Sequence, residues 1–305
     1  MLANWIYSHP TWIVGSVIVG LFVLLSCIGL AIVQRLVPVR LRRPHNDIVG
    51  FTIAVVGVVY AVLLAFIAVA TWETFRKSDN VVADEASYVG DVFRNTIGVP
   101  DDLARKLRGH LDEYIDVVIQ QEWPAQQEGR LEEASWQRGW DILADVHFDI
   151  ARFRPANAGE AVLQGQLLRS LNRLYDARRG RLLAAAEHVT PVIWWIIALG
   201  AMLTVSFSYL FGPPDFKMHA VITGMLAASL AVVMVLIVAL DYPFRGSLSV
   251  SDEAFLAVRK NWRRWLFNTE ATDTHGDWGA VAVDGGSVQA NSSKRRRQSR
   301  CSFRR

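Results

Sequence analysis

The sequence predicts an all-α integral membrane protein with four transmembrane helices and a helical cytosolic bundle inserted between the second and the third. Of its 305 residues, 52% are apolar and 20% are charged, whereas an average soluble domain is closer to a quarter charged. Four stretches without Asp, Glu, Lys or Arg each reach the ~20 residues that a helix needs to cross ~30 Å of hydrocarbon. The charged segment between the second and third stretches lacks the alternation of a strand, so helices are expected there.

These apolar stretches define the predicted domains. The spans are Ile13–Gln34, Ile48–Trp72, Val189–Pro214 and Met218–Leu240. In hydrocarbon every backbone N–H and C=O must be paired within the segment, which favours helices over strands. Residues 1–72 then hold spans one and two, and residues 73–188 form the cytosolic bundle. Residues 189–240 form a transmembrane hairpin of spans three and four. Residues 241–267 form an interfacial or cytosolic amphipathic helix, and residues 268–305 form a disordered polybasic tail.

Apolar spacing indicates four helices in the bundle. Span two continues as a stalk until Gly98 and Pro100 stop it. The second helix ends at Glu122-Trp123-Pro124, and the third carries an apolar stripe from Leu131 to Ile150. The fourth carries leucines from Leu163 to Leu182 and runs into span three. Such stripes are typical of helices that share a core.

The chain changes character after span four. Asp241, Pro243 and Gly246 mark the end of this helix, because proline cannot continue its hydrogen bonding and glycine tolerates a turn. Phe244 is then free to anchor in the headgroup layer. Ser251-Asp252-Glu253 starts an amphipathic helix that either packs on the bundle or lies on the membrane surface. Its apolar side carries Phe255, Val258, Trp262 and Trp265.

The tail from Asn268 is rich in Gly, Ser, Thr and Asp and is predicted to be disordered. It ends in a basic cluster of Lys294, Arg295, Arg296, Arg297, Arg300, Arg304 and Arg305. This cluster either attracts anionic lipids or is a solvated tail without a partner. The formal net charge is +3, and without these seven charges the rest of the chain carries −4. Nucleic-acid binding by the folded part is therefore not expected.

Charged residues near the spans predict the orientation. Four spans place both termini on one side of the plasma (inner) membrane, and the side with more Lys and Arg is expected to be cytoplasmic. Nine such residues flank the spans on the bundle side, at Arg76, Lys77, Arg173, Arg178, Arg179, Arg181, Arg245, Arg259 and Lys260. Five flank them on the other side, at Arg35, Arg40, Arg42, Arg43 and Lys217. The bundle and both termini are therefore predicted to be cytoplasmic.

Motifs that carry chemistry are few. No span contains Asp, Glu, Lys or Arg, which argues against a coupled transporter. The sequence has no Walker loop, dinucleotide-binding glycine motif or HExxH motif, so neither an enzyme nor a cofactor is expected. His147 and Asp149 are neighbours, but two potential ligands do not make a metal site. Cys27 and Cys301 are too few for a disulfide framework.

Span two carries a stripe of small residues. They recur at intervals of three or four and leave one side of the helix almost without side chains: Gly50, Ala54, Gly57, Ala61, Ala65 and Ala68. Small residues let helix backbones approach closely, so packing against another helix is one interpretation. The other interpretation is that the smooth face lines a narrow apolar pore in which gating occurs by dewetting.

Several short segments together resemble one family. They are Asn46-Asp47 with Gly50, Tyr60–Phe66, Trp72-Glu73, Asp84-Glu85-Ala86, Glu122-Trp123-Pro124, Tyr209–Gly212, Asp241–Gly246 and Ser251–Phe255. In the segment Asp241–Gly246, the residues that carry the resemblance are Asp241, Pro243, Phe244 and Gly246. Their combination resembles the bacterial bestrophin-like membrane protein family of unknown function, over roughly residues 10 to 267. The tail from Asn268 lies outside this resemblance.

The resemblance implies a layout and an activity. Bestrophins are pentameric anion channels with four spans, a large helical cytosolic insertion between spans two and three, and span two lining the pore. The acidic calcium clasp of animal bestrophins is not recognisable here, since only Asp252-Glu253 follows span four. The expectation is a homo-oligomeric channel for small anions in the lipid bilayer. The alternative is a non-conducting membrane scaffold or sensor whose cytosolic bundle binds a partner.

Overall fold

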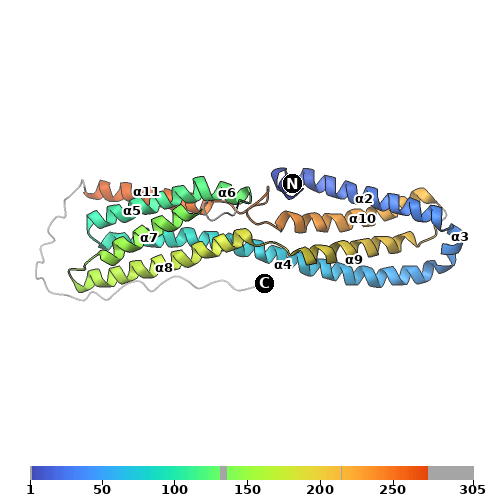
Figure 1. Ribbon diagram of the computed structural model, residues 1–305, viewed down its shortest axis with the longest axis horizontal. Helices are drawn as coiled ribbons and strands as arrows, with labels where there is room; N and C mark the ends of the chain where they lie inside the picture. Colours follow the sequence, from blue (N-terminus) through green and yellow to red (C-terminus); the bar gives the residue numbers. More distant parts are fainter. Residues whose placement is uncertain (1, 131–135, 214, 274–305) are drawn as a thin grey trace, which may run out of the picture. The chain divides into compact units, whose positions relative to one another are not determined.

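The computed structural model describes residues 2–130, 136–213 and 215–273. Every regular element in these ranges is a helix. The chain divides into two compact units, residues 1–264 and 265–305. In the first unit, the apolar helices lie beside one half of a single long helix, α4 (Asn46–Asn95; Figure 1).

Among the residues that the structure describes, four helices are long and apolar enough to cross a membrane. They are α2 (Thr11–Leu36), the first half of α4 (Asn46–Asn95), α9 (Pro191–Tyr209) and α10 (Phe216–Leu240). The predicted four apolar spans are thus confirmed. Short helices α1 (Leu2–Ser8), α3 (Val39–Arg42) and η1 (Arg43–His45) precede and link them. The third span is shorter than predicted at both ends: α9 begins with Pro191 at its first position, where proline is favoured, and it ends at Tyr209, before Pro214.

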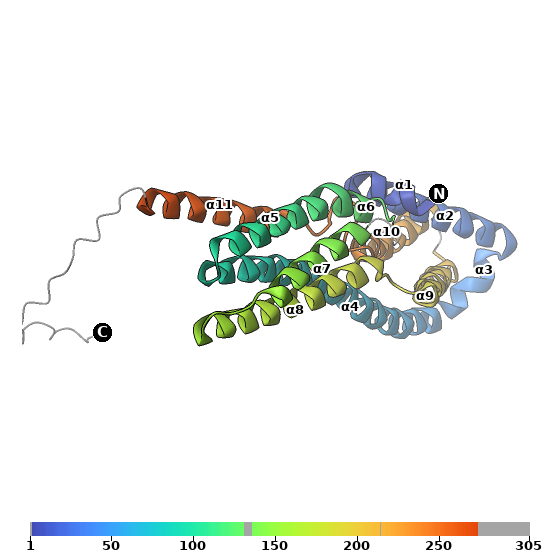
Figure 2. The same ribbon diagram turned by 60° about the vertical axis from the view of Figure 1, so that its left-hand side comes forward.

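Helix α4 joins two groups of helices. Its 50 residues correspond to about 75 Å at 1.5 Å per residue. Helices α2, α9 and α10 lie along its first half and α5, α7 and α8 along its second half, in both views (Figures 1 and 2). The core of the first group contains Tyr60 and Leu64 of α4 with Ile197, Ala201 and Ile237 of α9 and α10.

Glycines permit the close approach of the spans. A Cβ on Gly200 of α9 would lie 2.3 Å from a ring carbon of Tyr60, and one on Gly29 of α2 would lie 2.6 Å from the hydroxyl of Tyr209. The Tyr60 hydroxyl donates to the carbonyl of Ile197 at 2.7 Å. Here small residues serve helix packing, as expected for transmembrane interfaces.

The second half of α4 belongs to a bundle. It continues through η2 (Thr96–Gly98) into α5 (Asp101–Val117), followed by η3 (Val118–Glu122), α6 (Trp123–Gln127), α7 (Gln137–Arg152) and α8 (Ala158–Ala186). The stop predicted at Pro100 is observed. The stop predicted at Pro124 is wrong, because the chain passes it in helical form to Gln127. Leu131 lies outside the described residues.

Two further boundaries differ from the prediction. Helix α8 ends at Ala186 and does not run into the third span, since residues 187–190 are not helical. Helix α11 (Glu253–Asp273) continues beyond Asn268. Its first turns pack on the bundle: Phe255 is fully buried, and the rings of Trp262 and Phe93 lie 4.3 Å apart. Side chains from Trp265 onward and all of residues 274–305, including the basic cluster, lie outside the described residues.

Candidate functional site

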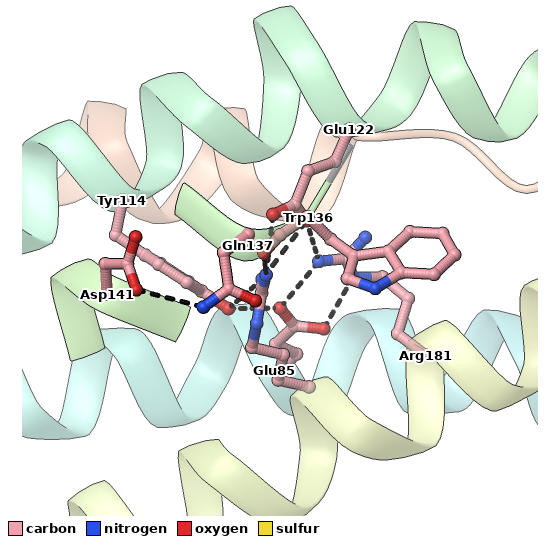
Figure 3. Close-up of polar contacts among 8 residues, drawn as sticks. Glu85, Tyr114, Glu122, Trp136, Gln137, Asp141 and Arg181 are labelled. Carbon is pink, nitrogen blue, oxygen red and sulfur yellow. Dashed lines mark hydrogen bonds and ion pairs between the residues drawn. The ribbon is translucent and has the colours of Figure 1, made fainter. Parts of the chain in front are cut away.

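Four ionisable side chains meet in the centre of the bundle. Glu85 comes from α4, Glu122 from η3, and Arg178 and Arg181 from α8, and all four are fully buried. Together with Tyr114 of α5, also fully buried, they are called the charge cluster below (Figure 3). The cluster contains two carboxylates and two guanidinium groups, so its formal charge is balanced.

Arg181 joins the two carboxylates. Its Nε donates to Glu85 Oε2 at 2.6 Å, and its Nη2 donates to Glu85 Oε1 at 3.1 Å and to Glu122 Oε2 at 2.7 Å. The Tyr114 hydroxyl donates to Glu85 Oε1 at 2.5 Å. Glu85 therefore receives a bidentate guanidinium and a phenol, and such charge-assisted hydrogen bonds are shorter and stronger than neutral ones.

Arg178 completes the charge cluster from the next turn of α8. Its Nη2 donates to Glu122 Oε1 at 2.6 Å and to the carbonyl of Trp136 at 2.8 Å, and its Nη1 donates to Glu122 Oε2 and the Tyr114 hydroxyl, both at 3.1 Å. The guanidinium carbon also lies 4.8 Å from the centre of the Trp140 ring. A cation over an aromatic face gains further stabilisation when water is excluded.

A π-helical turn and a glycine position the side chains of the charge cluster. The segment η3 is a turn of π-helix directly before Pro124, and a widened turn relieves the clash that a proline ring makes with the carbonyl four residues earlier. The widened turn places Glu122 in the bundle centre. Gly139 of α7 leaves room opposite, since a Cβ there would lie 2.3 Å from Arg178 Nη2 and 2.6 Å from Glu122 Oε1.

Mutual attraction keeps the charge cluster ionised. Burial would raise the pKa of Glu122, but Arg181 and Arg178 hold it below its usual value. Burial would lower the pKa of Arg181, but Glu85 and Glu122 raise it well above the ordinary value. Burial and the Glu85 charge raise the pKa of Tyr114. The carboxylate of Glu122 and the guanidinium of Arg181 thus stabilise each other's charged form, and this arrangement orients the helices that carry them.

Trp123, next to Glu122, links the bundle to the segment after the fourth span. Its ring makes edge contacts with Phe244 and Phe255, with centroids 5.6 and 6.3 Å away. Phe244 is 2% exposed, so the expectation that it anchors among lipid headgroups is wrong: the bundle buries it. Two sequence segments of the resemblance, around residues 122–124 and 241–255, therefore meet in space.

Asp241 lies where the third and fourth spans meet the bundle. Its Oδ1 accepts a hydrogen bond of 2.6 Å from the backbone N–H of Val189, just before α9. Burial raises its pKa above the ordinary value, against the opposing effect of the Val189 N–H. The carbonyl of Pro243 accepts from Val250 at 2.8 Å, and Gly246 has φ +86°, a turn conformation that favours glycine.

Other resemblance positions lie elsewhere. Asn46 accepts a hydrogen bond of 2.9 Å from the N–H of Gly212 and so joins the start of α4 to the turn after α9. Arg42 donates to the carbonyls of Tyr209 and Phe211 at 2.7 and 3.0 Å in the same place. Trp72 and Glu73 are exposed on α4 and take no part in either contact.

The stripe of small residues on α4 is mostly uncovered. Ala54, Ala61 and Ala65 are exposed, and a Cβ on Gly57 would meet no atom within 4 Å. At the two ends, Gly50 approaches the ring of Phe211 and Ala68 packs against the core of the spans. The middle of the stripe therefore has no packing partner among the described residues of one chain.

No metal centre is found in the part of the chain that the structure describes, where no three His, Cys, Asp or Glu residues cluster. Asp149 contacts Lys106 Nζ at 2.6 Å and His110 Nε2 at 3.4 Å. These contacts give Asp149 a role on the polar surface of the bundle.

Comparison with known proteins shows the family of this chain. The model of the Bestrophin-like domain family matches residues 20–255. The chain belongs to the bestrophin-like family. Among curated proteins nothing matches. Two crystal structures of a bacterial bestrophin homolog from Klebsiella pneumoniae, each with one mutation, are 15% identical to this chain with a TM-score of 0.59. The first match covers 80% of this chain and 97% of the homolog, and the second covers 81% and 96%. A crystal structure described as a membrane protein matches equally well, at 14% identity, TM-score 0.59, and coverage of 80% and 96%. At these identities the likeness shows the bestrophin fold.

Sequence reasoning missed three members of the charge cluster. Glu85 and Glu122 stood out only through the resemblance, and Tyr114, Arg178 and Arg181 were not linked to them. A signal existed, because Arg178 and Arg181 follow Leu174 at intervals of four and three and so continue the apolar stripe of α8. An arginine on the core side of a helix indicates a buried carboxylate partner.

Proposed function

We propose that this bestrophin-like chain is one subunit of a homo-oligomeric channel that passes small anions, with α4 surrounding the pathway. The observation that supports this proposal is the uncovered, uncharged middle of the α4 stripe at Ala54, Gly57, Ala61 and Ala65. By contrast, Gly200 of α9 has a close partner in Tyr60. A stripe without a partner in its own chain is available to other copies or to a pore.

A second exposed face of α4 lies beside the small-residue stripe. It carries the larger side chains of Val58, Val62 and Phe66, which are 64%, 50% and 71% exposed. Around a symmetry axis, one of these faces points to the axis and the other to the neighbouring copy. Either arrangement gives an apolar constriction without charge, which gates by dewetting.

Cysteine accessibility distinguishes the two faces. In a chain with Cys27→Ser, the variants Ala61→Cys and Val62→Cys are treated with a charged thiol reagent while chloride flux is followed. Block of the Ala61→Cys variant places the small-residue stripe on the pathway, whereas block of Val62→Cys places the larger residues there. If neither variant is blocked, α4 does not line the pathway.

Chloride flux is the primary test. The purified protein is reconstituted into liposomes at several lipid ratios, and the mass of the detergent-extracted particle is measured in parallel. The proposal expects flux that scales with protein and a particle of several chains. Sealed vesicles with a monomeric or dimeric particle support the alternative, a non-conducting scaffold or sensor whose bundle binds a partner.

The proposed orientation places the bundle and both termini in the cytoplasm of a plasma-membrane protein. Burial changes the charge comparison behind it, because Arg178 and Arg181 on the bundle side and Arg42 on the other side are buried. The bundle side keeps the larger number of positive residues, which supports the same orientation. Labelling of single cysteines introduced at exposed positions of the bundle in intact cells tests it.

A further inference from the structure

A cavity lies where three spans end, and no role has been assigned to it above. Its volume is about 340 Å³, within the range of ligand sites. It is lined by residues of α4 from Phe66 to Thr74, by the segment Glu187–Thr190 that links α8 to α9, by Ile193, and by Asp241 after α10. The apolar part of α4 ends at this level, and α9 and α10 begin and end here.

The lining is divided by polarity. Phe66, Ile67 and Ile193 form the apolar part, on the side of the spans. Glu187 and Asp241 form the acidic part, where the chain leaves the spans. If the spans cross a bilayer, the apolar part lies at the depth of acyl chains and the acidic part at the depth of the headgroups. The cavity therefore matches a molecule with an apolar chain and a polar end.

The polar end of that molecule is expected to be a cation. Asp241 is 6% exposed and burial raises its pKa, so a cation beside it would offset the cost of burying a carboxylate. No Lys or Arg belongs to the lining, but it includes His188, whose charge opposes the effect of burial on the pKa of Asp241. The Thr71 hydroxyl donates to the carbonyl of Ile67 at 2.8 Å and keeps its lone pairs as acceptors.

We propose that this cavity binds the ammonium group of an amphipathic molecule. The ammonium has three donors, which the carboxylates of Glu187 and Asp241 and the hydroxyl of Thr71 accept, and its alkyl part lies against Ile67 and Ile193. Two sources carry this chemistry, the headgroup of phosphatidylethanolamine in the bilayer and a free alkylammonium ion. Binding here does not depend on ion conduction.

Titration calorimetry on the detergent-solubilised oligomer tests the chemistry with n-octylammonium chloride and with n-octanol, which has the same chain without the charge. We expect octylammonium to bind and octanol to bind at least tenfold more weakly. Glu187→Gln is expected to weaken octylammonium binding about tenfold, the loss of one charge-assisted contact. Glu128→Gln, an exposed carboxylate outside the cavity, is the matched control and is expected to leave binding unchanged.

Ala70→Leu is the second variant, because it fills the cavity from the exposed side of α4 with a good helix former. It is expected to abolish octylammonium binding while the oligomer keeps its elution volume. Equal binding of octanol and octylammonium, or equal affinity in Glu187→Gln and wild type, would overturn the proposal.

Mass spectrometry of the intact particle distinguishes the two sources. The protein is extracted from bilayers that contain phosphatidylethanolamine, phosphatidylglycerol and phosphatidylcholine. The lipid is identified as the source if wild type selectively retains phosphatidylethanolamine, Ala70→Leu does not retain it, and octylammonium displaces it from wild type. Octylammonium binding without lipid retention identifies a free amine. If wild type takes up neither, the cavity site is refuted, whereas the channel proposal is judged separately by chloride flux.

Discussion

Replacement of Arg181 by methionine tests the role of the charge cluster directly. The variant removes three hydrogen bonds, two to Glu85 and one to Glu122. Glu85 then keeps only the Tyr114 hydroxyl as a donor among the contacts of the cluster, while Glu122 keeps Arg178. One carboxylate charge is left without a cation in a site that is fully buried.

The expected loss is large. Removing one partner of a buried ion pair costs about 3–5 kcal/mol, because the other charge stays desolvated. At about 2–4 °C per kcal/mol for a domain of this size class, the melting temperature of the solubilised protein should fall by roughly 6–20 °C. The double variant Glu85→Gln/Arg181→Met removes both charges, keeps an acceptor for Tyr114, and should recover about half of that loss.

Thermal unfolding followed by intrinsic tryptophan fluorescence measures these effects. Arg179→Met is the matched control, since Arg179 lies on the same helix with its side chain 65% exposed, and its loss should lower the melting temperature by no more than about 2 °C. The reasoning is refuted if Arg181→Met behaves like Arg179→Met, or if the double variant is no more stable than the single one.

Three further predictions concern stability. Gly139→Ala should lower the free energy of unfolding by about 1–3 kcal/mol, because its Cβ would overlap the charge cluster. Gly109→Ala in α5, whose Cβ would meet nothing within 4 Å, should raise the free energy of unfolding by about 0.5–1 kcal/mol. Chemical denaturation in detergent compares the two variants, and a change of the same sign in both would contradict the structure. Because the folded pKa of Glu122 is depressed from 4.5, its stabilisation is fully present above that value and is lost as pH falls through the folded pKa; the difference in melting temperature between wild type and Glu122→Gln should be level from pH 7 to 5 and shrink at pH 4, and a difference that already shrinks above pH 5 would argue against an ionised Glu122. Asp241→Ala should cost about 1 kcal/mol through loss of the acceptor for Val189, and Asp241→Asn much less; melting curves check this order, and equal losses in the two variants would show that charge and not hydrogen bonding matters at this position.

The spans were predictable because continuous apolar stretches have one stable backbone form in hydrocarbon. Their limits were less predictable: α8 ends at Ala186, and shortly after it the N–H of Val189 bonds to Asp241, 52 positions away in the sequence. The stop at Pro124 was mispredicted because a π turn accommodates the proline. Such a turn has no simple sequence signature.

The candidate sites were predictable only in part. Sequence spacing on α4 showed the small-residue stripe, but only the packed structure shows that its middle is uncovered. The charge cluster joins residues 29 to 96 positions apart. Pairing over such separations follows from tertiary packing and not from local periodicity. The stripe of α8 indicated that Arg178 and Arg181 face the core, without naming their partners.

The unbroken course of α4 has a mechanical consequence. A helix advances by about 100° and 1.5 Å with each residue, so inserting a single alanine after Trp72 would turn Glu85 away from Arg181 while leaving every span residue in register. Conversely, a twist imposed on the bundle by a bound partner would be carried as torsion into the membrane part of the same rod, with no hinge to absorb it.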